Sequence, residues 1–147
     1  MAKRLKLLLA APNWLGDLVM ATSLFDLFTF GETQYGIPRP ELHVSVRRRW
    51  RPLLTGDTRL AGLVDYERSG RHAGLPGIHR QAAVWRDASP SAVMVLPPSL
   101  RAGAVARLSG IRMRIGFSGE GRDLLLSPAV ARPQRGALPH AEGWPPP

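Results

Sequence analysis

Short, continuous apolar runs alternate along the chain with longer segments of mixed polarity. The first run covers residues 5–11 and is followed by Pro12 and Gly16, which predicts a short strand buried on both faces, as in a parallel sheet. Residues 18–30 have helical periodicity, because their polar residues fall on one narrow stripe while apolar residues cover the rest. We therefore expect one helix over residues 18–30, with the polar stripe formed by Thr22, Asp26 and Thr29.

The remaining segments repeat this alternation of apolar runs and helical patterns. Ser99 precedes a helical pattern at residues 100–108 and is expected to cap that helix. The three glycines within residues 70–77 predict a loop. Strands that alternate with helices predict an α/β fold with a doubly wound parallel sheet. The further expected strands are residues 42–46, 63–66, 92–96 and 113–117, and the further expected helices lie at 50–54 and around His79, Arg80 and Arg86.

Asp17 follows the first strand at the point where a helix is expected to begin. On the helical projection it lies over Leu24 and Phe28 rather than on the polar stripe, which predicts a carboxylate on the buried side of the helix start. That position is the carboxyl edge of the sheet, where open α/β folds bind their ligands. The alternative is a helix cap or first-turn residue that stabilises the helix by ~1 kcal/mol. Gly16 has a similar alternative, as a turn residue with positive φ.

Residues 12–20, 93–99 and 110–126 form three motifs that, in this order, resemble those of glycosyltransferase family 9, the heptosyltransferases of lipopolysaccharide synthesis. Residues 12–20, Pro-Asn-Trp-Leu-Gly-Asp-Leu-Val-Met, resemble the opening motif of that family and are closer to its type II members. Residues 93–99, Val-Met-Val-Leu-Pro-Pro-Ser, resemble the strand and the Leu-Pro-x-Ser sequence that the family carries next. Residues 110–126 resemble the third motif, in the same order along the chain.

This resemblance implies a GT-B enzyme with two Rossmann-like domains, of which the chain carries the N-terminal, acceptor-binding half. The implied reaction is an inverting, metal-independent transfer of heptose from ADP-heptose to the lipopolysaccharide inner core. Asp17 is the implied catalytic base, since an acceptor hydroxyl is a poor nucleophile until a carboxylate accepts its proton. The implied acceptor-binding residues are Asn13, Trp14 and Gly16, which would shape a loop, and Ser99, Arg101 and Arg122, which would bind phosphate or carboxylate groups.

The resemblance also predicts how the chain is divided. Residues 1–127 correspond to a Rossmann-like acceptor domain, and residues 128–147 contain six prolines and read as a flexible tail where a second domain would follow. We interpret this as a truncated or frameshifted gene, or a deliberately shortened chain. The donor ADP-heptose is then expected to bind the missing domain, so the chain needs no cofactor of its own and is expected to be inactive alone. A separate chain that carries the donor domain is an expected partner.

Charge suggests a further class of function. The chain has 20 basic and 11 acidic residues, a net charge of +9, which favours anionic partners such as nucleic acid, an anionic membrane surface or a phosphorylated sugar. A small basic α/β module that binds nucleic acid is therefore the alternative function, although no nucleic-acid-binding motif is present and nucleic acid is the less favoured partner.

The sequence lacks the features of a membrane-spanning protein, of a disulfide-bonded protein and of a zinc site. No apolar run approaches the roughly 18 residues of a membrane span, and the chain has no cysteine, so a cytoplasmic location is expected. The basic charge and the resemblance together add an expected peripheral contact with the anionic surface of the inner membrane. The four histidines are scattered without the spacing of a zinc site, so no metal is expected.

Overall fold

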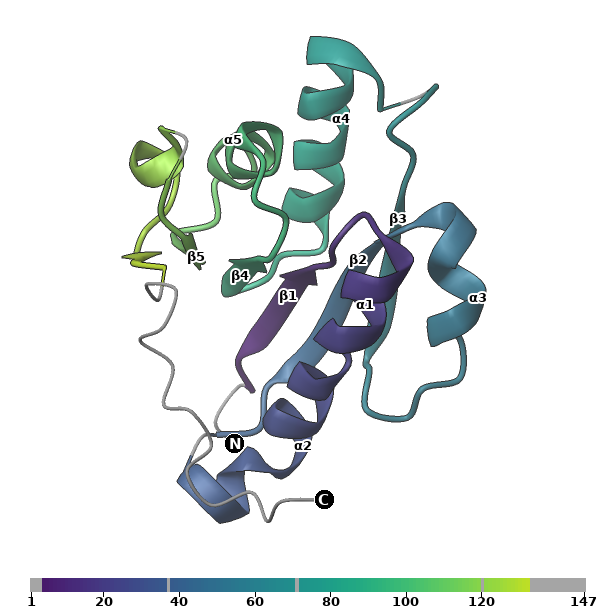
Figure 1. The fold of residues 1–147 in the computed structure, drawn as a ribbon, viewed down its shortest axis with the longest axis vertical. Coiled ribbons are helices and arrows are strands. Elements are labelled where there is room, and N and C mark those ends of the chain that lie inside the picture. Colours follow the sequence, from purple (N-terminus) through teal and green to yellow (C-terminus); the bar gives the residue numbers. More distant parts are fainter. Residues whose placement is uncertain (1–3, 37, 71, 120, 133–147) are drawn as a thin grey trace, which may run out of the picture.

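The protein contains a six-stranded parallel sheet (Figure 1). The computed structural model describes residues 4–36, 38–70, 72–119 and 121–132. The strand order is β3-β2-β1-β4-β5-β6, so the first strand lies at the centre and the order reverses between β1 and β4. The predicted α/β fold with a parallel sheet is confirmed. The strands are β1 (Lys6–Ala10), β2 (Glu41–Arg47), β3 (Gly62–Tyr66), β4 (Ala92–Val95), β5 (Met113–Phe117) and β6 (Ala129–Val130).

Helices lie on both faces of the sheet, α4 and α5 on one and α1, α2 and α3 on the other (Figure 1). Side chains of β1 alternate between two apolar clusters, because successive residues of a strand point to opposite faces. Leu7 and Leu9 pack with α1–α3, and Leu8 and Ala10 pack with α4 and α5. The elements are α1 (Leu15–Ala21), α2 (Ser23–Tyr35), the 3-10 helix η1 (Arg48–Trp50), α3 (Arg51–Leu54), α4 (Gly74–Asp87), α5 (Leu100–Leu108) and the 3-10 helix η2 (Arg122–Leu124).

The single helix expected over residues 18–30 is wrong, because the segment forms two helices that meet at Thr22. Thr22 Oγ1 donates to the carbonyl of Val19 at 2.6 Å, and Ser23 Oγ donates to the carbonyl of Met20 at 2.8 Å. Hydroxyl side chains that bind the backbone in this way compete with continuous helical hydrogen bonding. The loop expected at residues 70–77 is also partly wrong, since α4 begins at Gly74.

The remaining predicted elements agree with the structure to within one or two residues. Beyond the expected boundary at residue 127, β6 pairs with β5 through Ala129 and Val130. Residues 133–147 lie outside the described residues, so the flexible tail stays a prediction. Within the described part of the chain, no helix combines the length and the apolar character that crossing a membrane requires.

Ser99 caps α5 as predicted. Its backbone is extended, and its Oγ accepts a hydrogen bond from the amide of Ala102 at 3.2 Å. Ser99→Ala should lower the free energy of unfolding by ~1 kcal/mol, because the backbone amide of Ala102 loses its hydrogen-bond acceptor. Ser99→Gly should cost only a few tenths of a kcal/mol. Urea denaturation of both variants measures the difference, and an alanine variant as stable as the wild type would contradict the capping role.

Candidate functional site

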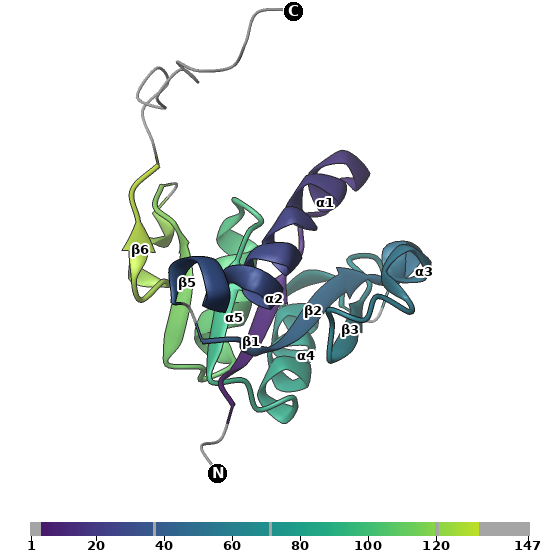
Figure 2. The same ribbon diagram turned by 90° about the horizontal axis from the view of Figure 1, so that it is seen from below.

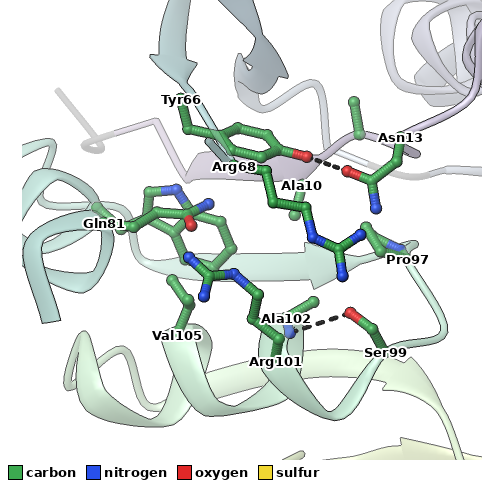
Figure 3. A pocket seen from close by; sticks show the side chains of 12 residues that line it. Ala10, Asn13, Tyr66, Arg68, Gln81, Pro97, Ser99, Arg101, Ala102 and Val105 are labelled. Carbon is green, nitrogen blue, oxygen red and sulfur yellow. Dashed lines mark hydrogen bonds between the residues drawn. The ribbon is translucent and has the colours of Figure 1, made fainter. Parts of the chain in front are cut away.

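Three strands end around one small cavity at the carboxyl edge of the sheet (Figure 3). The loop after β1 contributes Asn13, the segment after β3 contributes Arg68, and the start of α5 after β4 contributes Arg101. The order of strands reverses between β1 and β4, and open α/β sheets bind ligands at such a point. The cavity is lined by Ala10, Ala11, Asn13, Tyr66, Arg68, Gln81, Trp85, Pro97, Ser99, Arg101, Ala102 and Val105.

Asn13 is held in place from two sides. The buried Tyr66 hydroxyl donates to Asn13 Oδ1, and Trp50 Nε1 donates to the Asn13 carbonyl at 3.2 Å. Burial raises the pKa of the Tyr66 hydroxyl, while the positive charges of Arg47, Arg68 and Arg101 act in the opposite direction. An unperturbed tyrosine already titrates near pH 10, so a raised pKa keeps this hydroxyl protonated and donating at neutral pH. The loop after β1 is thereby fixed to β3 and η1.

Two arginines bring positive charge to the same place. Figure 3 shows Arg68 and Arg101 entering the cavity from opposite sides. Burial lowers the pKa of the Arg101 guanidinium, and the like charge of Arg68 acts in the same direction. Arg101 is positioned by the carbonyls of His72 and Gly74, to which it donates. None of the described residues that line the cavity is acidic, so this pair of guanidinium groups favours a phosphate or carboxylate.

One wall of the cavity is formed by buried side chains. Trp85 is buried and donates from Nε1 to the buried Ser45 Oγ at 3.0 Å, and Gln81 is buried beside it. The cavity encloses about 30 Å³, enough for a water molecule or two. A sugar ring does not fit a space of this size, whereas a small anionic group would reach Arg68 and Arg101 there.

A larger basin continues from the cavity and shares Tyr66 and Arg68 with it. The basin has a volume of about 420 Å³, which lies within the range of small-molecule sites. Arg48 in this basin approaches Glu67 at 3.6 Å, an exposed contact that leaves the basin predominantly basic. The basin is lined by Arg47, Arg48, Arg49, Tyr66, Glu67, Arg68 and Ser69.

Asp17 lies in the first turn of α1, just beyond the carboxyl end of β1. Its predicted place at this edge is confirmed, but its predicted orientation toward the buried side is wrong, because its side chain is exposed. The continuous helix that placed it over Leu24 and Phe28 is interrupted at Thr22. The alternative for Asp17 is confirmed in its second form, because Trp14 occupies the cap position and Asp17 is a first-turn residue of α1.

Gly16 and Trp14 present open surface beside Asp17. The alternative for Gly16, a turn residue with positive φ, is wrong, because Gly16 lies within α1 and is not among the positive-φ glycines of the described residues. A Cβ atom at Gly16 would have no neighbour within 4 Å, so packing in the described structure does not require glycine there. Trp14 is 73% exposed, which is unusual for the largest apolar side chain. This helix start is open to a ligand or to another polypeptide.

Arg122 lies apart from this surface. Its side chain is fully buried, and its guanidinium donates to the carbonyl of Pro97 at 2.7 Å and to the carbonyl of Phe117. These carbonyls follow β4 and end β5, so Arg122 joins two neighbouring segments at the edge of the sheet. A fully buried guanidinium that binds two backbone carbonyls differs from the direct acceptor contact that the resemblance implies for Arg122.

The structure thus brings together three of the expected site residues, Asn13, Ser99 and Arg101. Sequence reasoning missed Tyr66 and Arg68, although both lie at the end of a strand that was predicted. Both residues could have been found from the sequence, because parallel strands end at the same edge of a sheet and residues at the end of β3 therefore lie at the edge expected for Asp17. Among the described residues, no group of three histidine, aspartate or glutamate side chains is arranged to hold a metal ion.

Comparisons with known proteins place this geometry in context. No family model matches the chain, and a search of curated proteins finds no match. Among solved structures, the ADP-heptose lipopolysaccharide heptosyltransferase II of E. coli matches with a TM-score of 0.65 and 27% identity, over 83% of this chain and 33% of that one. A family 9 glycosyl transferase from Veillonella parvula matches with a TM-score of 0.74 and 15% identity, over 92% of this chain and 38% of that one.

The chain therefore spans about a third of the length of these two solved proteins, 33% of one and 38% of the other. The resemblance to glycosyltransferase family 9 is confirmed as a structural match that covers one domain of these GT-B proteins. The Veillonella match supports the fold alone at its level of identity.

Proposed function

We propose that the chain is the acceptor-side part of an inverting heptosyltransferase that transfers heptose from ADP-heptose to the lipopolysaccharide inner core. The observation that carries this proposal is the pair Arg68 and Arg101 at the carboxyl edge, with no acidic residue among those that line the cavity. The 27% identity to a heptosyltransferase over 83% of the chain supports the same assignment.

The proposed chemistry needs one proton acceptor on this chain. A hydroxyl of the acceptor sugar attacks the anomeric carbon of ADP-heptose, the bond from that carbon to the diphosphate breaks, and ADP leaves. The Asp17 carboxylate accepts the proton of the attacking hydroxyl, which makes the oxygen a better nucleophile. Its exposure in the first turn of α1 leaves it accessible to a sugar, and the absence of a Cβ at Gly16 lets that sugar approach the helix backbone.

The arginines would orient the acceptor rather than take part in bond making. Guanidinium groups bind phosphate and carboxylate oxygens through paired hydrogen bonds, which fix both position and angle. The cavity between Arg68 and Arg101 would take one anionic substituent, and the basin beside it, with Arg47, Arg48 and Arg49, would take the sugar that carries this substituent. Correct placement of the hydroxyl then contributes to the rate of transfer.

The proposed role of this chain does not include binding of the donor. ADP-heptose would bind a second domain, supplied by further polypeptide or by a separate chain, and the chain alone would be inactive. We place the protein in the cytoplasm, at the inner membrane surface, because the proposed acceptor is anchored to a lipid and the chain carries a net charge of +9.

Calorimetric titration with a phosphorylated inner-core oligosaccharide tests the proposal. Arg68→Ala should weaken binding by ~10- to 100-fold, because a hydrogen bond to a charged group contributes ~1.5–3 kcal/mol. Arg68 is exposed, so its removal should leave the fold intact, and Arg112→Ala, at an exposed position outside both cavities, is the matched control. Equal affinity of wild type and Arg68→Ala would contradict the site.

The same preparation distinguishes the alternative function. A nucleic-acid-binding module should bind duplex DNA tightly at low salt and lose affinity steeply as salt rises, without binding the oligosaccharide. That combination of results would replace the heptosyltransferase proposal.

A further inference from the structure

Gln81 is a buried amide that the proposed function does not use. It belongs to α4, is only 6% exposed, and lines the small cavity that also contains Arg68 and Arg101. Figure 3 shows its side chain reaching from α4 into the cavity, on the side where Arg101 enters. Within the described part of the chain, no hydrogen bond joins this amide to another residue. Its two N–H donors and its carbonyl acceptor are therefore available to a ligand.

A buried amide in this situation is uncommon. Most buried polar groups in native proteins are hydrogen-bonded, because burial removes their contacts with water. Trp85, one turn further along α4, follows this rule and donates from Nε1 to Ser45 Oγ at 3.0 Å. The backbone of Gln81 is fixed by the packing of α4 beside α5, on the face of the sheet opposite to α1 and α2 (Figure 2). The fold therefore holds an amide at the cavity without a partner from the chain itself, which indicates a role toward a ligand.

Hydrogen-bond donors reach the cavity from four different segments of the chain. The Oδ1 atom of Asn13 already accepts a hydrogen bond from the Tyr66 hydroxyl, so Nδ2 is the part of that amide left for a ligand. A group bound in the cavity is surrounded by donors rather than contacted from one side (Figure 3). The donors are the side chains of Asn13 after β1, Arg68 after β3, Gln81 in α4 and Arg101 in α5.

A phosphate monoester matches this arrangement better than a carboxylate does. The two oxygens of a carboxylate lie in one plane, and a pair of guanidinium groups is enough to bind both. A phosphate monoester has three terminal oxygens in a tetrahedral arrangement and carries ~1.5–2 negative charges at neutral pH. Its third oxygen needs a further donor from another direction, which Gln81 supplies. The cavity volume of about 30 Å³ and the lack of an acidic residue among the described residues that line it also favour a small, highly charged group.

We propose that this cavity selects a phosphate monoester on the acceptor sugar and that Gln81 determines this specificity. The inference rests on the proposed function, in which the cavity takes one anionic substituent of the acceptor. Nε2 of Gln81 donates to the terminal phosphate oxygen that a carboxylate lacks. Gln81 thus binds the acceptor and takes no part in bond making, and an acceptor without the phosphate binds weakly.

NMR titration of the full chain with methyl phosphate and with acetate tests the cavity directly. Methyl phosphate should shift the side-chain amide signal of Gln81, and acetate should leave that signal in place. Gln81→Leu should weaken methyl phosphate binding by ~10-fold, followed by the indole signal of Trp85 in the same cavity, and should leave acetate binding unchanged. His79→Leu, at an exposed position of α4 outside this cavity, is the matched control and should bind both ions as the wild type does.

Thermal unfolding of Gln81→Leu separates a binding role from a structural one. Leucine has a similar volume and buries no polar atom, so Tm should stay the same or rise. A lower Tm would show that the amide stabilises the fold and would overturn the inference. The same conclusion follows if methyl phosphate leaves the Gln81 signal in place, because the cavity then holds only water, or if Gln81→Leu binds methyl phosphate as tightly as the wild type does.

Oligosaccharide binding distinguishes failure of this inference from failure of the proposed function. The wild type should bind a phosphorylated inner-core oligosaccharide at least ~10-fold more tightly than the same oligosaccharide after phosphatase treatment, and Gln81→Leu should lose most of this preference. Equal affinity of the wild type for the two forms would overturn the inference and leave the proposed function standing. Binding of methyl phosphate without binding of either oligosaccharide would support the phosphate cavity and contradict the proposed function.

Discussion

Asp17→Asn should lower kcat by ~10²–10⁴-fold once the chain is fused to a donor domain from a close relative. The amide has nearly the same shape as the carboxylate but cannot accept the proton of the attacking hydroxyl. Oligosaccharide affinity should be retained, because Arg68 and Arg101 are unchanged and lie in a cavity that Asp17 does not line. Turnover and oligosaccharide binding measured on the same two fusion proteins give the result.

A matched control separates catalysis from helix stabilisation. A carboxylate in a first helical turn contributes ~0.3–1 kcal/mol, so Asp17→Asn should lower Tm by only a few degrees. Asp87→Asn removes an equally exposed carboxylate at the end of α4 and should leave turnover unchanged. Unchanged turnover in the Asp17 variant, with a small loss of stability, would assign Asp17 to the helix start alone.

Arg122→Met should lower the free energy of unfolding by about 3 kcal/mol. The substitution removes two hydrogen bonds that a buried guanidinium donates, a buried one to the carbonyl of Pro97 and a part-buried one to the carbonyl of Phe117. A buried acceptor that loses its partner costs ~1–3 kcal/mol, and two such losses are expected here. The shift in the midpoint of urea denaturation at constant slope measures this effect.

Arg112→Met is the control for this substitution, because Arg112 is exposed and precedes β5, the strand that ends at Phe117. Its stability should stay within about 0.5 kcal/mol of the wild type, as for most surface substitutions. The acceptor-binding role implied for Arg122 makes the opposite prediction, namely unchanged stability and weaker binding of the oligosaccharide. Both quantities can be measured on the same protein samples.

The sequence predicted the strands well because burial on two faces leaves an unambiguous pattern. Residues 5–11 and 92–96 are almost continuous apolar runs, and the corresponding β1 and β4 lie at the centre of the sheet. The helix after β1 was predicted less well, because periodicity does not reveal a junction between two helices of similar polarity. The hydrogen bonds of Thr22 and Ser23 that accompany this junction depend on local geometry.

The site was predicted only in part, since sequence position gives the edge of the sheet but not the direction of a side chain. Asn13 and Arg101 face the cavity as expected, whereas Asp17 is exposed and Arg122 is buried. The environment of Arg122 depends on the carbonyl of Phe117, which is near in sequence, and on the carbonyl of Pro97 after β4, which lies 25 residues away. Long-range contacts of this kind have no signature in a local pattern.

The central place of β1 has a consequence for how the chain folds as it is synthesised. Leu7 pairs with Leu42 on one side and with Ala92 on the other, so the strand that leaves the ribosome early acquires its second neighbour late. During that interval an apolar strand has one unpaired edge and one incomplete face, which is the condition that favours aggregation of nascent chains. Parallel pairing over such sequence separations is also slow to form. Chaperone assistance during translation, and a yield that improves at lower expression temperature, are the expected consequences.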